Sequence, residues 1–157
     1  SVSGPQQAQV IEAALEIKID GRRLFDSLQV TWNILERSTT QVLGEAHKMG
    51  VGIIVKEALA NGRLTDKNTA PDDAAKLAVF NEEAQRLNAT VDGLALAAVL
   101  AQPWADVVLS GAARVEHLES NLKAVDVAYD GQAENRLFKL VEDPGVYWET
   151  RSRLAWN

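Results

Sequence analysis

Cysteine is absent from the 157 residues of the chain. Its absence excludes disulfides, thiolate metal sites and cysteine nucleophiles, and it fits a reducing compartment. Acidic residues outnumber basic ones, since the chain has 22 Asp and Glu and 16 Lys and Arg, which gives a net charge of −6. Basic runs with interleaved aromatic residues, stretches long enough to span a membrane and an N-terminal leader pattern are also lacking. We therefore expect a soluble, cytoplasmic protein without nucleic-acid or membrane partners.

The common catalytic signatures are missing as well, including HExxH, GxSxG, the Walker loop and GxGxxG. The two histidines, His47 and His117, each lie on a predicted helix, where a solvated or capping role is expected. Lys56 and Glu57 follow a predicted strand, where an adjacent acid and base would suit proton transfer. Because neighbours at a strand end point to different sides, an ion pair or a loop anchor is the favoured interpretation. Motifs alone therefore assign no catalytic and no metal-binding residue.

Strand and helix patterns alternate along the chain, and 46% hydrophobic content suffices for the core of one domain over residues 1–157. Strands are predicted for an N-terminal stub and for residues 28–35, 51–55 and 107–109, with helical periodicity between them. This alternation predicts a parallel sheet in an α/β fold. About four βα units form either half of a (β/α)₈ TIM barrel or a small doubly wound, flavodoxin-like sheet. In both folds, ligands bind at the carboxyl ends of the strands.

Turn and cap residues indicate the connections between these elements. Asp20-Gly21 predicts a small hairpin, and Gly50 predicts the end of a helix. Residues 38–41, STTQ, have the spacing of a capping box, and Thr90 is a predicted N-cap. In the C-terminal part, a last short helix is expected, with Tyr147, Trp148 and Trp156 packing the tail onto the body.

Residues 106–125, DVVLSGAARVEHLESNLKAV, are the most informative stretch. Residues 107–109 form an unbroken apolar run that predicts a strand buried on both faces. Apolar residues then recur on one helical face, at Val115, Leu118, Leu122 and Val125. Gly111 between strand and helix, the free N–H groups of the first turn, and Arg114 favour a phosphate. The alternative is an ordinary βα turn with a surface arginine.

Residues 25–125 resemble the C-terminal half of the aldo-keto reductase superfamily, a (β/α)₈ barrel that uses NADP(H). LQVTWNIL is similar to the sixth barrel strand, HKMGVGIIVKEALANGRLT to the seventh strand and its loop, and VVLSGAARVEHLESNLKAV to the eighth strand and helix. SVSGPQQAQ looks like the end of the fifth strand, and residues 126–157 look like the C-terminal helix and tail.

The resemblance implies a set of cofactor contacts. Gln29 and Ser1, or Ser3 in an alternative register, match positions at the nicotinamide, and Lys56 stands where relatives commonly have a stacking aromatic ring. The loop at residues 57–64 matches the one that covers the pyrophosphate; Gly111, Ala112 and Arg114 match the 2′-phosphate segment, and the positions after them match the adenine edge. The implied cofactor-binding residues are Ser1, Gln29, Lys56, Glu57, Leu59, Ala60, Gly62, Gly111, Ala112, Arg114, His117, Ser120 and Asn121.

The family's catalytic aspartate, tyrosine, lysine and histidine lie in the first half of the barrel, to which no part of this chain corresponds. The resemblance thus implies that this chain is the cofactor-binding half of an NADP(H)-dependent oxidoreductase. With the N-terminal half present, as a missing segment or a separate chain, the enzyme would reduce small aldehydes or ketones to alcohols. The alternative is a half-barrel that acts alone or pairs with a second copy, as a nucleotide-binding or regulatory module.

Overall fold

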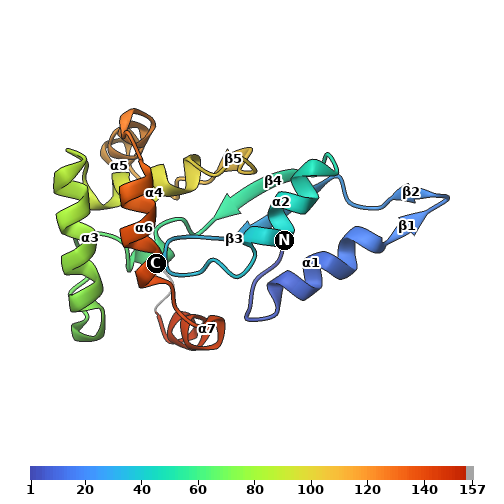
Figure 1. Cartoon of the computed structure of the whole chain (residues 1–157), viewed down its shortest axis with the longest axis horizontal. Helices are drawn as coiled ribbons and strands as arrows, with labels where there is room; N and C mark the ends of the chain where they lie inside the picture. The colour runs from blue at the N-terminus through green and yellow to red at the C-terminus, as the bar shows by residue number, and fades with distance from the viewer. Residues whose placement is uncertain (155–157) are drawn as a thin grey trace.

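A three-stranded parallel sheet lies at the centre of the computed structural model, which describes residues 1–154 (Figure 1). Its strands are β3 (Ser27–Thr31), β4 (Gly52–Lys56) and β5 (Val107–Val108), in the order β3-β4-β5. The N-terminal stub adds a fourth position, since Val2 forms a parallel bridge with Val30. Neighbours in the sheet are therefore successive in the chain. A doubly wound sheet requires a reversal of strand order, so this topology favours part of a barrel.

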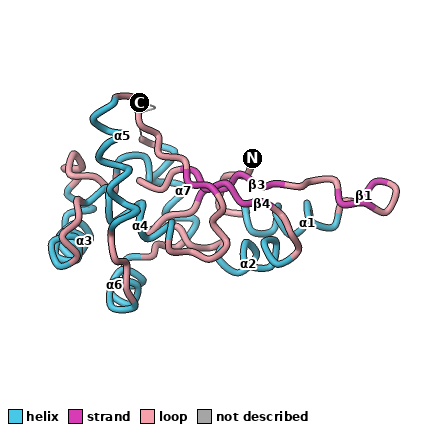
Figure 2. The backbone as a smooth tube through the Cα atoms, turned by 90° about the horizontal axis from the view of Figure 1, so that it is seen from above, coloured by secondary structure: helices cyan, strands magenta, loops and turns pink. Residues whose placement is uncertain are grey.

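Helices surround the sheet unevenly. α1 (Gln7–Glu16) and the antiparallel hairpin of β1 (Lys18–Ile19) and β2 (Arg22–Arg23) extend to one end, and α2 (Thr40–Lys48) lies beside the strands (Figures 1 and 2). The other end holds α3 (Ala74–Arg86), α4 (Val91–Leu100), α5 (Val115–Leu122), α6 (Gly131–Leu137) and α7 (Pro144–Ser152). Short 3₁₀ turns are η1 (Ala60–Gly62), η2 (Pro71–Asp73), η3 (Lys123–Asp126) and η4 (Phe138–Leu140).

The predicted turns and caps are confirmed with one exception. Gly21 and Gly50 have φ of 78° and 77°, and the Thr90 Oγ1 accepts from the Gly93 N–H over 3.1 Å at the start of α4. The capping box at residues 38–41 is wrong, because the N-cap is Thr39 and its side chain makes no capping hydrogen bond. Gln41 instead donates to Glu45 one turn later, over 3.1 Å.

The strand predicted for residues 28–35 is shorter, and ends at Thr31. Asn33 causes the departure from the sheet, because its Oδ1 accepts from the backbone N–H groups of Leu35 and Glu36 over 3.0 and 3.1 Å. Such side-chain bonds replace the ladder of a strand. The segment stays buried, and Trp32 packs edge to face against Trp104 with ring centroids 5.4 Å apart.

Two apolar clusters form the core. One joins the sheet to α1, α2 and α4 through residues such as Ile11, Leu43 and Val55. The other joins α3, α4, α6 and α7 through Phe80, Leu94, Leu137 and Tyr147, among others. The C-terminal part holds two helices, α6 and α7, where one was predicted. Tyr147 and Trp148 pack as expected, whereas Trp156 lies outside the described residues.

The prediction that residues 107–109 are buried on both faces is wrong. Val107 is 48% exposed and Leu109 42% exposed, because β5 is the edge of the described sheet and pairs there with β4 alone. The apolar face of the following helix is also exposed. Leu118, Leu122 and Val125 contribute to the lining of a groove of about 130 Å³. The "exposed apolar face" comprises Val107, Leu109, Val115, Leu118, Leu122 and Val125.

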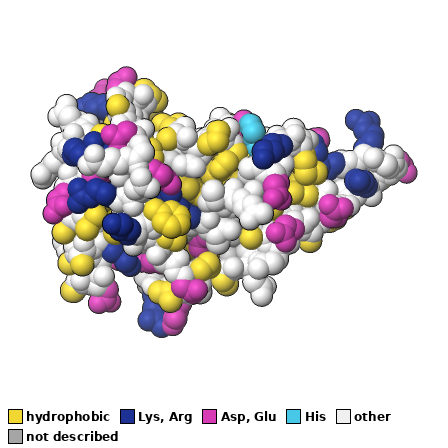
Figure 3. Space-filling view, viewed as in Figure 1, with side chains coloured by type: hydrophobic (Ala, Val, Ile, Leu, Met, Phe, Trp, Pro, Cys, Tyr) yellow, Lys and Arg dark blue, Asp and Glu magenta, His cyan; other side chains and the backbone are white. Residues whose placement is uncertain are grey.

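The charged side chains form no single-sign patch on the face in Figure 3, where both signs are interspersed over the α3–α6 end. Within residues 1–154, no helix is both long and apolar enough to cross a membrane.

Candidate functional site

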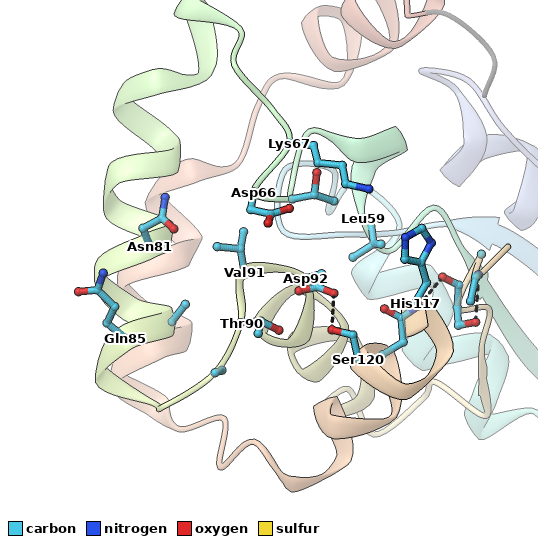
Figure 4. Close-up of a pocket in the computed structure, with 17 residues that line it drawn as sticks. Leu59, Asp66, Lys67, Asn81, Gln85, Thr90, Val91, Asp92, His117 and Ser120 are labelled. Atoms are coloured by element: carbon cyan, nitrogen blue, oxygen red, sulfur yellow. Dashed lines mark hydrogen bonds between the residues drawn. The ribbon is translucent and has the colours of Figure 1, made fainter. Parts of the chain in front are cut away.

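A pocket of about 490 Å³ opens beyond the carboxyl ends of β4 and β5 (Figure 4). Asn81 and Gln85 of α3 lie on one side of it and His117 and Ser120 of α5 on the other, with Asp66 along a third side. Ligands of parallel α/β sheets bind at this end of the strands. The pocket is lined by Leu59, Thr65, Asp66, Lys67, Asn81, Ala84, Gln85, Ala89, Thr90, Val91, Asp92, Ser110, Gly111, Ala112, His117, Ser120 and Asn121.

Several of the predicted cofactor residues meet in this pocket. Gly111 has φ of 65°, a left-handed conformation that glycine adopts without steric cost and that turns the chain from β5 toward α5. Asn121 is nearly buried and donates to the Ser110 carbonyl over 3.0 Å, which fixes the turn to the helix. The predicted residues that line the pocket are Leu59, Gly111, Ala112, His117, Ser120 and Asn121.

Arg114 is the N-cap of α5, between Ala112 and His117, and its side chain is exposed and is not part of the pocket lining. Its predicted role at the 2′-phosphate stays a prediction. The cation that the structure brings to the pocket is Lys67, in the loop after β4, together with the titratable His117. Two carboxylates, Asp66 and Asp92, share the lining. Asp92 accepts from the Ser120 hydroxyl over 3.0 Å, which links α4 to α5 (Figure 4). The site is thus polar and mixed in charge.

Sequence reasoning missed Lys67, Asp92 and the two α3 residues, Asn81 and Gln85. The only available signal was the length of the polar stretch after β4, because loops of that size are often functional. Asn81 and Gln85 share a helix face by their spacing of four, but any solvated helix shows such pairs. Their position at the pocket depends on how α3 packs beside α4.

Ser1, Gln29 and Lys56 lie apart from the pocket, on the sheet. The Lys56 Nζ donates to the Ser1 Oγ over 3.1 Å and to the Ser3 Oγ over 2.6 Å, so the end of β4 and the N-terminal stub are tied together. Gln29 is half-buried on β3, opposite Ile54. Lys56 is the last residue of β4, whereas Gln29 lies in the middle of β3. The role of Ser1, Gln29 and Lys56 at the nicotinamide stays a prediction.

Glu57 does not pair with Lys56. Its carboxylate accepts from the Arg151 Nη2 over 2.7 Å, and its backbone carbonyl accepts from the Asn33 Nδ2 over 3.0 Å. The loop-anchor interpretation of Glu57 is therefore confirmed. The hydrogen bonds that Arg151 donates to the Glu57 carboxylate also raise the pKa of Arg151 above its usual range.

The loop that follows β4 is tightly wound. Glu57, Ala60, Asn61 and Gly62 have φ of 58°, 48°, 54° and 87°. A left-handed conformation costs a non-glycine residue about 1–2 kcal/mol, so surrounding contacts must hold it. Ala60 is fully buried. Ala60 and Gly62 therefore shape the loop, while Leu59 and residues 65–67 reach the pocket.

Arg63 supplies another anchor that sequence reasoning missed. Its guanidinium donates to Asp73 over 3.0 and 2.6 Å and to Glu142 over 2.9 and 2.6 Å. The hydrogen bonds from Arg63 lower the pKa of Asp73 and outweigh the opposing effect of burial. At Glu142 burial acts to raise the pKa, but bonds from Arg63 and Lys76 lower it below the usual range.

The sequence of the chain matches one protein family over most of its length. The model of the "Aldo/keto reductase family" matches residues 1–142. The chain belongs to the aldo/keto reductase family. The resemblance noted in the sequence is thereby confirmed, and with it membership in a family of oxidoreductases that typically use nicotinamide cofactors.

Individual relatives agree with this assignment. The "Uncharacterized oxidoreductase YrpG" of Bacillus subtilis (strain 168) is 29% identical over 143 residues, which are 82% of this chain and 43% of YrpG. Among solved structures, the thermostable aldo-keto reductase Tm1743, in complex with the inhibitor epalrestat, gives a TM-score of 0.60 at 28% identity over 73% of this chain and 39% of Tm1743. The holo form of aldo-keto reductase AKR11C1 from Bacillus halodurans gives 0.68 at 21% identity over 87% of this chain and 46% of AKR11C1.

This aldo/keto reductase chain thus spans less than half the length of each of these relatives. Its fold is α/β with a parallel sheet, consistent with part of the barrels that the solved relatives form.

Proposed function

We propose that the chain is the cofactor-binding half of an NADP(H)-dependent aldo/keto reductase, which works in the cytoplasm and reduces small aldehydes or ketones to alcohols when the N-terminal half is present. One observation carries this proposal. The pocket at the carboxyl ends of β4 and β5 brings together residues from the loop after β4 and the turn after β5, which the family resemblance matches to cofactor contacts. Its volume lies within the range of about 300–1,000 Å³ that is usual for cofactor sites.

The chemistry of the lining suits the adenosine end of the cofactor. The amides of Asn81 and Gln85 and the hydroxyl of Ser120 offer donors and acceptors to a purine and a ribose. Lys67 and the protonated form of His117 would attract the 2′-phosphate that distinguishes NADP from NAD. The bound cofactor would supply a hydride to the carbonyl carbon. The residues of this chain would bind and orient it, with Gln29 and Lys56 at the nicotinamide end.

The N-terminal half is proposed as the partner that completes the barrel. The exposed apolar face and the free edge of β5 together offer a strand edge and apolar side chains to a second polypeptide. The relatives are more than twice as long as the matched region, which leaves a segment of suitable size.

The second candidate function is a self-pairing half-barrel that binds a nucleotide without catalysis. The same exposed face favours it, because a second copy would cover that face with its own open edge. Light scattering of the purified chain separates the two. A dimer that Leu122→Asp dissociates supports self-pairing, and a stable monomer supports the complementary half as partner.

A titration with NADPH and NADH tests the cofactor proposal. We expect NADPH to bind roughly 10- to 150-fold more tightly, because charge-assisted hydrogen bonds to the extra phosphate contribute about 1.5–3 kcal/mol. The variant His117→Ala should weaken NADPH binding, whereas His47→Ala on α2, outside the pocket, should leave it unchanged. Equal affinities would contradict recognition of the phosphate, and failure to bind either nucleotide would overturn the proposal.

A further inference from the structure

The loop after β4 is bonded to one C-terminal segment at two points. We call residues 57–67 the pocket loop and residues 142–151 the strap. At the loop's start, Glu57 receives hydrogen bonds from Arg151 of the strap, over 2.7 and 3.3 Å. Six residues later, Arg63 donates two bonds to Glu142 of the strap. Leu59 lies between these two anchors and residues 65–67 follow the second one. These four residues of the loop line the pocket.

The side chains that form the anchor at Arg63 are almost completely buried from solvent. The exposed fractions of the Arg63, Asp73 and Glu142 side chains are 6%, 9% and 5%. A buried guanidinium with two bidentate carboxylates has a fixed orientation, because its planar fork permits little rotation. Asn68 strengthens this anchor, since its Nδ2 donates to the Arg63 carbonyl and to the Asp73 Oδ2, each over 2.9 Å. Arg63 is therefore fixed by Asp73 and Glu142 through its side chain and by Asn68 through its carbonyl.

The anchor at Glu57 combines a side chain and the backbone. The side chains of Arg151 and Glu57 are 10% and 15% exposed. The Asn33 Nδ2 donates to the Glu57 carbonyl and to the hydroxyl of Tyr147, which is fully buried in the strap. Two independent contacts thus fix the residue at which the loop first adopts a positive φ.

We propose that the strap sets the shape of the pocket loop, so that Glu57 and Arg63 are positioning residues on which cofactor affinity depends although neither lines the pocket. The identity of the ligand rests on the proposed function. The physical reason is the backbone of the loop, which has four positive φ values between residues 57 and 62. Such a conformation persists only where surrounding contacts over-determine it. A loop released from its anchors populates other shapes, and apparent affinity falls with the fraction that remains competent.

The variant Glu142→Gln tests the strap with the smallest change, because it keeps the volume of the side chain and removes its charge. Arg63→Lys is the second variant, because it keeps the positive charge and removes the planar guanidinium that bonds both carboxylates. A matched control is Glu149→Gln, since Glu149 of α7 pairs with Arg153, the C-cap of that helix, and both side chains are largely exposed. All three are compared with the unsubstituted 157-residue chain.

Two measurements are made on each variant. Amide hydrogen exchange is followed in the pocket loop, where the N–H groups of residues 60, 62, 63 and 64 are bonded within the loop and have protection to lose. The amides of β3 and β4 report whether the core is intact. NADPH affinity is measured by titration under the same conditions.

With Glu142→Gln and Arg63→Lys, we expect loop amides to exchange about tenfold faster and the NADPH Kd to rise by a similar factor, while β3 and β4 keep their exchange rates. The control should match the unsubstituted chain in both measurements. If amide exchange in the pocket loop is unchanged in both variants, the proposal that the strap shapes the loop is wrong. It is also wrong if the loop amides exchange faster but the NADPH affinity stays the same. If the unsubstituted chain itself binds no NADPH, the proposed function fails, and loop exchange alone then decides whether the strap holds the loop.

Discussion

The Asn33 Nδ2 donates to the Tyr147 hydroxyl over 2.9 Å in the interior of the protein, although 114 residues separate them in the chain. The same nitrogen donates to the Glu57 carbonyl over 3.0 Å. Both amide hydrogens of Asn33 are therefore satisfied, by the C-terminal helix on one side and by the end of β4 on the other. Burial raises the pKa of Tyr147 well above its usual range, so its hydroxyl stays protonated at any physiological pH.

Removal of the Tyr147 hydroxyl should destabilise the fold. Tyr147→Phe leaves one hydrogen of a buried amide without its partner, a change that costs about 1–3 kcal/mol. The free energy of unfolding, measured in urea, should fall by that amount. Val146→Ala on the same helix is the control, because Val146 is exposed and its truncation should change stability by no more than about 0.5 kcal/mol. Equal effects of the two substitutions would contradict the hydrogen bond.

Truncation of two leucines should distinguish the core from the exposed apolar face. Leu43→Ala in α2 removes a fully buried side chain and should cost about 2–5 kcal/mol of unfolding free energy. Leu122→Ala in α5 removes a side chain that is 57% exposed, and should cost less than about 1 kcal/mol. Chemical denaturation of the two variants checks this. A large loss at Leu122 would show that the exposed apolar face is covered in solution.

The carboxylate of Asp73 should make the protein sensitive to acid. Its folded pKa lies below the usual value of 3.8, so the stability it contributes is present above that pH and is lost as pH falls further, through the folded pKa. Asp73→Asn should therefore be less stable than the unsubstituted chain by about 1–3 kcal/mol at pH 7, and the difference should shrink below pH ~4. Urea unfolding at several pH values measures it.

The adjacent Asp72 provides the control for this experiment. It is exposed, so Asp72→Asn should change the free energy of unfolding at pH 7 by no more than about 0.5 kcal/mol. A difference for Asp73→Asn that stays constant from pH 7 to pH 3 would contradict the assigned ion pair.

Two cations near α5 should differ in their effect on cofactor binding. Lys67 lines the pocket, whereas Arg114 is exposed outside it. Lys67→Ala should therefore weaken NADPH binding about tenfold, and Arg114→Ala should weaken it by less than about threefold. The NADH affinity of both variants should change little, because NADH lacks the 2′-phosphate. A larger effect of Arg114 would favour the contact that the sequence pattern suggested.

Local patterns predicted those elements whose cause is local. Thr90 caps α4 because its hydroxyl reaches an N–H three residues later, and Gly50 ends α2 because a positive φ stops a helix. The apolar run at residues 51–55 predicted β4, which neighbouring elements then cover. The capping box predicted at residues 38–41 does not form, because Thr39 is the N-cap, the Ser38 N–H donates to Glu36 and the Gln41 side chain donates to Glu45.

Local sequence patterns did not predict contacts between residues that are far apart in the chain. Arg63 and Glu142 are 79 residues apart, and nothing in the neighbourhood of either shows that they meet. The apolar spacing predicted the exposed face that Val115, Leu118 and Leu122 of α5 form, but whether that face is covered depends on what lies beside β5.

By itself, the sequence determined the order of the strands and of the helices before α6, the aldo/keto reductase family and most of the turn between β5 and α5. Periodicity, glycine conformation and motif matches are properties of short segments. Tertiary structure alone decided that Lys67, Asn81 and Asp92 share a pocket with His117, and that Arg114 lies outside it. It also decided which ion pairs are buried. The physical reason is that a pocket and a buried charge pair depend on how separate elements pack, and packing brings together residues that no local spacing relates.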